Sequence, residues 1–87
     1  MRIWIKLFKD NRLLKDTMFI DNGEDTRTHK VFSAVEKCCA EFDIPEPIWL
    51  DVNIRDFQRF ARCRFYQDSF IEEMEFDYMD FHLIEED

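Results

Sequence analysis

Carboxylates crowd the C-terminal end of this chain and are the first candidates for chemistry. Gln67–Asp87 holds nine Asp and Glu residues and no Lys or Arg, whereas residues 1–66 hold the other 11 acids and all 12 Lys and Arg. A specific calcium site needs evenly spaced ligands of the Asp-x-Asp-x-Asp-Gly type, and the loop Asp21–Asp25 lacks that spacing. We therefore expect an acidic surface here, with no metal site.

Two uses of these acids stay open. Exposed acids would bind a basic protein, and closely spaced ones would imitate a nucleic-acid backbone, where charges recur about every 1.7 Å. If the last strand instead lies beside the first, the acids would neutralise Arg2, Lys6 and Lys15 within the fold, and charge patterning alone favours this second use. The acidic excess argues against nucleic acid as a direct ligand.

The cysteines and histidines lack the neighbouring residues that catalysis or metal binding requires. A nucleophilic thiol needs a nearby base and a cationic or helix-N-terminal setting. Cys38 falls near the end of a predicted helix and Cys39 has no obvious base, while zinc would need paired ligands that Cys63, His29 and His82 do not supply. A single glycine also excludes a glycine-rich phosphate loop. We predict structural thiols, no cofactor and no enzyme; catalysis would need a pocket that sets His82 or Cys63 against carboxylates.

Four arginines lie within ten residues, at positions 55, 59, 62 and 64. A row of guanidinium groups suits anion binding, because each one can donate two parallel hydrogen bonds. In a chain of net charge −8 the nearest anions are its own carboxylates, so we expect these arginines to be neutralised internally or solvated.

Hydrophobic periodicity predicts a single α+β domain over residues 1–87, of order ββααββ, with an antiparallel sheet and two helices on one face. Thr26 or Asp25 can cap the first helix, and Asn53 or Asp51 the second. The first helix carries an apolar stripe of Val31, Ala34, Val35, Cys38 and Phe42, and Pro45 stops it. The strands are expected at 2–9, 12–20, 62–66 and 76–84 and the second helix at 54–61, with 67–75 left unassigned.

The turn at Asp10-Asn11 sets the register of the first hairpin, because a two-residue turn places Lys9 opposite Arg12. One face then carries Ile3, Ile5, Leu7, Leu14, Met18 and Ile20, with Asp16 as its only polar residue, and we expect it to face the core. The other carries Arg2, Trp4, Lys6, Phe8, Leu13, Lys15, Thr17 and Phe19. This second face would be left open by the helices, and a large contiguous exposed apolar group usually marks an interface.

Several strings resemble a family of small bacterial proteins of uncharacterised activity. They are Arg2-Ile3-Trp4-Ile5-Lys6-Leu7-Phe8-Lys9-Asp10, Pro47-Ile48-Trp49-Leu50, Phe70-Ile71-Glu72-Glu73 and Phe76-Asp77-Tyr78. The resemblance runs along nearly the whole chain. It implies a bacterial cytosolic protein of α+β type and brings no activity, ligand or site residue.

The sequence thus predicts a non-catalytic protein-binding or regulatory module that contacts its partner through the acidic C-terminal segment and the open sheet face. The expected charged contacts are Glu72, Glu73, Glu75, Asp77 and Asp80, and the expected apolar anchors are Trp4, Phe8 and Tyr78. The partner would be another protein, either a basic protein or a second copy of the chain. The alternative is an acidic nucleic-acid mimic that inhibits a DNA- or RNA-binding protein. No apolar stretch is long enough for a signal peptide or a membrane span, so we expect a cytoplasmic location without membrane contact.

Overall fold

A tight hairpin opens the fold. In a computed structural model that describes residues 1–87, β1 (Arg2–Lys9) and β2 (Arg12–Ile20) pair antiparallel around Asp10 and Asn11. Both turn residues have positive φ, of 52° and 63°, as a turn that matches the strand twist requires. The predicted bounds of both strands are confirmed.

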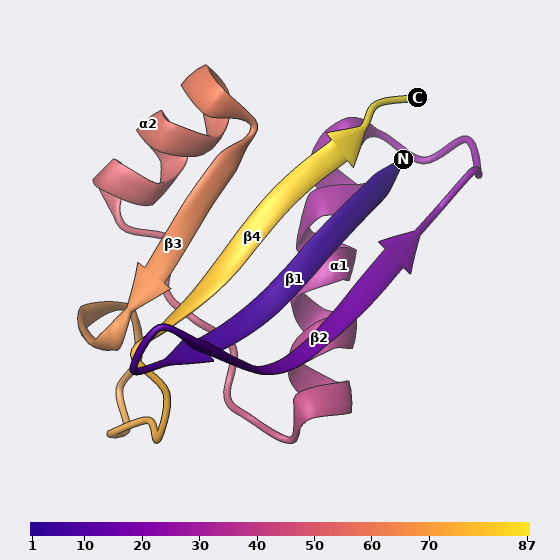
Figure 1. Cartoon of the computed structure of the whole chain (residues 1–87). Coiled ribbons are helices and arrows are strands. Elements are labelled where there is room, and N and C mark those ends of the chain that lie inside the picture. The colour runs from indigo at the N-terminus through magenta and orange to yellow at the C-terminus, as the bar shows by residue number, and fades with distance from the viewer.

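The remaining strands complete a four-stranded antiparallel sheet of order β2-β1-β4-β3 (Figure 1). After α1 (Arg27–Phe42) and α2 (Asp51–Phe60) come β3 (Arg62–Tyr66), the short 3₁₀ turn η1 (Gln67–Ser69) and β4 (Tyr78–Glu85). The order ββααββ confirms the predicted fold class. Because β4 lies between β1 and β3, the acidic last strand is the direct neighbour of the basic first strand.

The first helix forms as its sequence predicts. Thr26 is the N-cap, and its hydroxyl accepts a hydrogen bond from the backbone N–H of His29 at 3.2 Å. All five residues of the predicted apolar stripe are buried against the sheet. The helix ends at Asp43, in the left-handed conformation, two residues before Pro45.

The second helix begins three residues earlier than predicted. Asn53 lies within α2, where its side chain accepts from the N–H of Leu50 at 3.0 Å and donates to the carbonyl of Arg64 at 2.8 Å. The hydroxyl of Ser69 also donates to Asn53. The buried Asn53 therefore joins α2, β3 and η1, while the adjacent Ile54 is exposed.

The core lies between the sheet and the helices and is rich in aromatic rings. Trp49 packs edge-on against Phe57, Phe65 and Phe81, with ring centroids 4.9–5.8 Å apart. The inward residues of the central strands, among them Ile3, Ile5 and Met79, are fully buried. Each large apolar side chain buried in this way contributes about 1.5–3 kcal/mol.

The predicted register of β2 is wrong beyond Leu13. A bulge opposite the Leu7–Phe8 step inserts Leu14, so that Lys6 pairs with Asp16 instead of the expected Lys15. One extra residue turns every later side chain to the other face of the sheet. The sequence places Asp16, Met18 and Ile20 on the core face and Lys15, Thr17 and Phe19 on the open face, and the bulge exchanges the two sets. Met18 and Ile20 are therefore exposed and Phe19 is buried, and Leu14 is exposed as well.

Candidate protein-binding face

The helices leave one face of the sheet uncovered, and this face points toward the viewer in Figure 1. We call it the open sheet face. The register arranges its side chains in rows that cross the strands in the order β2, β1, β4, β3. The rows are Leu13–Phe8–Tyr78–Tyr66, Asp16–Lys6–Asp80–Arg64 and Met18–Trp4–His82–Arg62, which we call the aromatic, charged and mixed rows.

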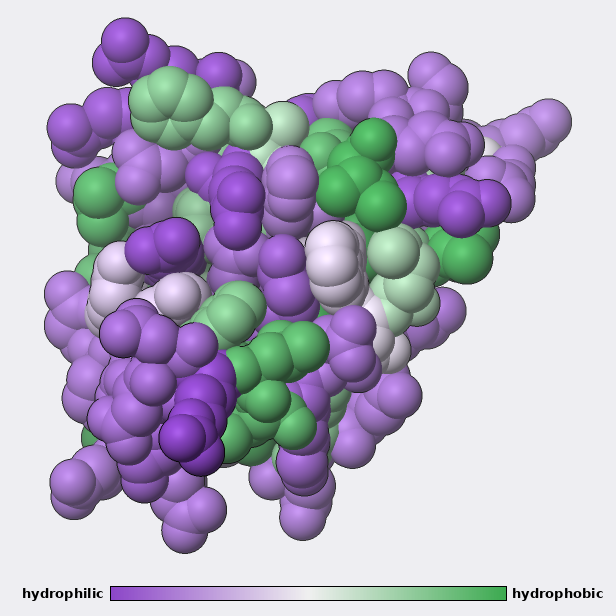
Figure 2. Space-filling view, in the orientation of Figure 1, coloured by the Kyte–Doolittle hydropathy of each residue, from purple (hydrophilic) through white to green (hydrophobic).

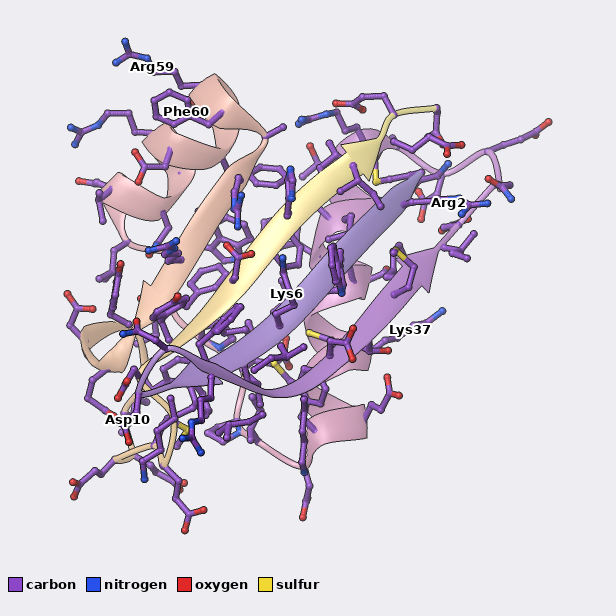
Figure 3. All side chains as sticks on the ribbon, in the orientation of Figure 1. Arg2, Lys6, Asp10, Lys37, Arg59 and Phe60 are labelled. Atoms are coloured by element: carbon purple, nitrogen blue, oxygen red, sulfur yellow. The ribbon has the colours of Figure 1, made fainter.

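Asp80 is the centre of the charged row. Its carboxylate is fully buried and accepts two hydrogen bonds from Arg62, each of 2.9 Å, while the ammonium of Lys6 lies 3.4 Å away. Arg64 approaches to 4.0 Å. Lys6 rises from the middle of the sheet (Figure 3). Three cations around one acid make Asp80 an internal counter-charge, so its predicted role as a free partner-binding acid is not supported.

The aromatic row forms a continuous surface of rings. Phe8 and Tyr78 stack with centroids 5.2 Å apart, and Tyr66 lies 5.5 Å from Tyr78. The guanidinium carbon of Arg64 lies 4.6 Å above the Tyr78 ring, a cation–π contact. Phe8 and Tyr78 are half-buried and Tyr66 is exposed. The row therefore offers apolar area whose geometry is already fixed by its neighbours.

The mixed row is held by polar contacts at its β1 member. The indole N–H of Trp4 donates to Asp16 at 2.9 Å, and the ammonium of Lys6 lies 3.8 Å from the centroid of the Trp4 ring. Burial lowers the pKa of His82, and the positive charge of Arg62 adds to that shift. His82 is thus held toward its neutral form on this face.

The charged row lies between the aromatic row and the apolar residues of the mixed row, so the expected contiguous apolar group is divided into two parts. Figure 2 shows hydrophilic residues between separate hydrophobic groups on the side toward the viewer. Its three rows carry the cations Lys6, Arg62 and Arg64 against the acids Asp16 and Asp80. The face is therefore slightly positive on a chain of net charge −8.

The other predicted acids lie away from the charged row. Glu72, Glu73 and Glu75 are exposed in the loop between η1 and β4 and form no ion pair in the structure. Asp77 accepts a hydrogen bond from the backbone N–H of Asp10 at 2.8 Å, so it fastens the β1–β2 turn. The predicted acidic and aromatic contact region is therefore two surfaces, the open sheet face and this acidic loop.

Several members of the open sheet face were missed from the sequence: Asp16, Met18, Arg62, Arg64, Tyr66 and His82. Arg62, Arg64 and Tyr66 alternate along β3, and this period of two was the available signal for one shared face. The close spacing in the sequence groups Arg62 with Arg55 and Arg59 instead, which lie on α2. Asp16 and Met18 were placed on the wrong face because the bulge at Leu14 leaves no mark in the sequence.

One cavity brings Cys63 together with the carboxylates of Asp56 and Asp68, which is the kind of pocket that the enzyme alternative requires. This cavity, of about 270 Å³, lies between α2 and β3 and is also lined by Arg62, and a second one of about 220 Å³ separates α1 from α2. Burial raises the pKa of the Cys63 thiol to about 12, and the nearby charges of Asp56 and Asp80 add to the shift. No group of three His, Cys, Asp or Glu side chains is placed to hold a metal ion.

Comparison with protein-family models, with curated proteins and with solved structures found no significant match. The resemblance to a bacterial family therefore stays a prediction. Neither helix is long and apolar enough to cross a membrane.

Proposed function

We propose that this protein is a non-catalytic binding module that recognises another protein through the open sheet face. The observation that carries the proposal is the set of side chains on that face: Trp4, Phe8, Met18, Tyr66, Tyr78, Arg62 and Arg64. Aromatic residues, Met and Arg are the residue types enriched in protein–protein contacts, and Trp, Tyr and Arg dominate their energies. The open sheet face carries all of these residue types.

Preorganisation supports the same proposal. Fixing a long side chain on binding costs about 0.5–1.5 kcal/mol. Here Arg62 is already held by two hydrogen bonds, Arg64 rests on Tyr78, and Trp4 is tied to Asp16. A partner would meet side chains whose freedom is already reduced, and less of the binding free energy would be lost in ordering them.

The acidic loop has a separate part in the proposal. Glu72, Glu73 and Glu75 are exposed and unpaired, and charges at the rim of a contact steer encounter more than they add affinity. With a basic partner, their neutralisation to Gln should slow association and reduce its salt dependence, with little effect on the lifetime of the complex.

The nucleic-acid mimic loses support relative to the sequence prediction. A mimic needs closely spaced, partner-free carboxylates. Of the five acids predicted as charged partner contacts, Asp80 is buried beneath cations and Asp77 holds the hairpin turn, so neither is a partner-free carboxylate. We also propose that the protein is cytoplasmic, because a reducing compartment keeps its three free cysteines in the thiol form.

The test compares partner capture by matched variants. Tyr66→Ala removes an exposed ring from the open sheet face, and Phe32→Ala removes an equally exposed ring from α1; the two residues are 49% and 52% exposed. The proteins retained from host lysate by the wild-type chain should be lost with Tyr66→Ala and kept with Phe32→Ala. Equal retention by both variants would contradict the proposal.

A further inference from the structure

The charged row of the open sheet face has a property that none of its residues has alone. Read from β2 to β3, Asp16, Lys6, Asp80 and Arg64 alternate in sign across all four strands. Asp80 is fully buried beneath its cations, so the charges that this row exposes to a partner are Asp16 at the β2 edge and Arg64 at the β3 edge. A row with an acid at one edge and a base at the other is complementary to itself when one copy is reversed and repels itself when the two copies run in the same direction.

We propose that the partner of the open sheet face is a second copy of this chain, packed face to face about a two-fold axis that runs parallel to the strands between β1 and β4. This inference rests on the proposed function, because it names the occupant of the same face. Such an axis reverses each row against itself, so Asp16 of each copy meets Arg64 of the other, once at each edge of the contact.

The same operation also suits the aromatic row. Reversal brings Phe8 opposite Tyr78 of the second copy, and Leu13 opposite Tyr66, so apolar groups meet apolar groups. In the mixed row it sets Trp4 opposite His82 and Met18 opposite Arg62.

A two-fold axis perpendicular to the strands is excluded by charge. It would place the charged row on an identical, unreversed copy, with Asp16 against Asp16 and Lys6 against Lys6. Stacked sheets align to within about 30° and lie about 10 Å apart, so the central row keeps the best match. The charged row is that central row, which is where its complementarity counts most.

The size of the face predicts a weak dimer. Four strands spaced by about 4.8 Å, over a shared length of roughly 20–25 Å, present on the order of 500 Å² from each chain. Contacts of that total size lie at the low end for specific association, and we expect a dissociation constant of about 10–100 µM. The dimer should weaken as salt concentration rises, because the facing charges of Asp16 and Arg64 are exposed.

The decisive experiment is a charge swap between two chains, followed by sedimentation equilibrium. Asp16→Arg alone and Arg64→Asp alone each set like charges against one another twice in a homodimer, and each should weaken dimerisation about ten-fold or more. An equimolar mixture of the two variants restores both attractive pairs, so it should dimerise to within about three-fold of wild type. Wild-type dimerisation without recovery in the mixture would overturn the proposed arrangement.

Cross-linking supplies a second measurement that does not depend on charge reversal. In the proposed dimer, position 16 lies opposite position 64 of the second copy, while the two copies of position 16 sit at opposite edges, three strand spacings or about 14 Å apart laterally. A short bismaleimide should therefore join two chains of the Asp16→Cys/Arg64→Cys double variant and not those of Asp16→Cys alone. Cross-linking of the single variant would favour the perpendicular axis and overturn the proposal.

Failure of this inference is distinguishable from failure of the proposed function. A wild-type chain that stays monomeric up to about 0.5 mM, well above the expected dissociation constant, would rule out the second copy as the occupant. The comparison of Tyr66→Ala with Phe32→Ala would still test whether a different protein binds the face. If Tyr66→Ala changes neither dimerisation nor capture, both proposals fall.

Discussion

Asp80 shows how one residue can stabilise the fold while it lies on the candidate binding surface. It is fully buried although it belongs to the open sheet face, because Arg62, Lys6 and Arg64 close over it. A buried carboxylate is stable only with such partners, and removing one member of the cluster leaves the others without compensation.

Asp80→Asn should lower the free energy of unfolding by about 2–3 kcal/mol, because it leaves Arg62 and Lys6 without their shared acid. Urea denaturation would measure the change. Glu73→Gln is the matched control, since Glu73 is exposed and unpaired, and it should shift stability by no more than about 0.5 kcal/mol. Equal small effects would mean that Asp80 is not a structural counter-charge.

The three thiols should be inert in the native protein. All are buried, and the pKa of Cys63 is raised to about 12, so its thiolate is scarce at neutral pH. Iodoacetamide at pH 8 should label the folded chain at least ten-fold more slowly than the urea-unfolded chain, as read by intact-mass spectrometry. Rapid labelling of a single native cysteine would revive a reactive-thiol role.

At the scale of elements, the bulge in β2 decides which side chains enter the core. The alternation of the hairpin fits two registers equally well, and each buries a different apolar set. The inserted Leu14 selects the register that buries Phe19 beneath α1 and turns Met18 outward. The exposed Met18 then joins the mixed row of the open sheet face.

The two registers predict opposite mutational effects, so stability measurements separate them. Phe19 is 7% exposed and Met18 is 40% exposed. Phe19→Ala should cost about 3 kcal/mol, and Met18→Ala less than about 1 kcal/mol. A larger loss for Met18→Ala in urea denaturation would restore the register without the bulge.

At the scale of the whole molecule, ion pairs join segments that are distant in the sequence. The carboxylate of Asp87 bridges the buried ammonium of Lys30 at 2.6 Å and the amino group of Met1 at 2.7 Å. These bonds hold the last residue against α1 and the start of β1, and they lower the pKa of Asp87. Glu85 pairs with Arg2 in the same region. The acidic end is thus partly an internal counter-charge and partly, at the acidic loop, free.

Stability should fall in two steps as pH decreases. His82 has a pKa below its ordinary 6.5, so the unfolded chain takes up a proton first and stability drops as pH falls from that value toward the folded pKa. Asp87 has a pKa below its ordinary 3.8, so its contribution is present above that value and is lost as pH falls through the folded pKa. The free energy of unfolding measured at pH 7.5, 5 and 3 would resolve both steps. His82→Gln should reduce only the first loss of stability, and Asp87→Asn only the second.

The sequence by itself determined the elements and their order. Local signals sufficed for this: the Asp10-Asn11 turn, the Thr26 cap, the apolar stripe of α1 and the alternation of β1, each of which acts between near neighbours. It also located the face left open by the helices, with Trp4, Phe8 and Tyr78 on it.

Only the tertiary structure decided the composition of that face. The β2 bulge and the placement of β4 between β1 and β3 are set by the combined packing of distant strands, which no local pattern encodes. These two features place Asp16, Lys6, Asp80 and Arg64 in one row. They also separate Asp80 from the unpaired acids of the acidic loop. A one-residue shift in any strand would exchange the side chains on its two faces. The residues of the candidate binding surface therefore follow from the strand pairing in the structure and not from the sequence pattern alone.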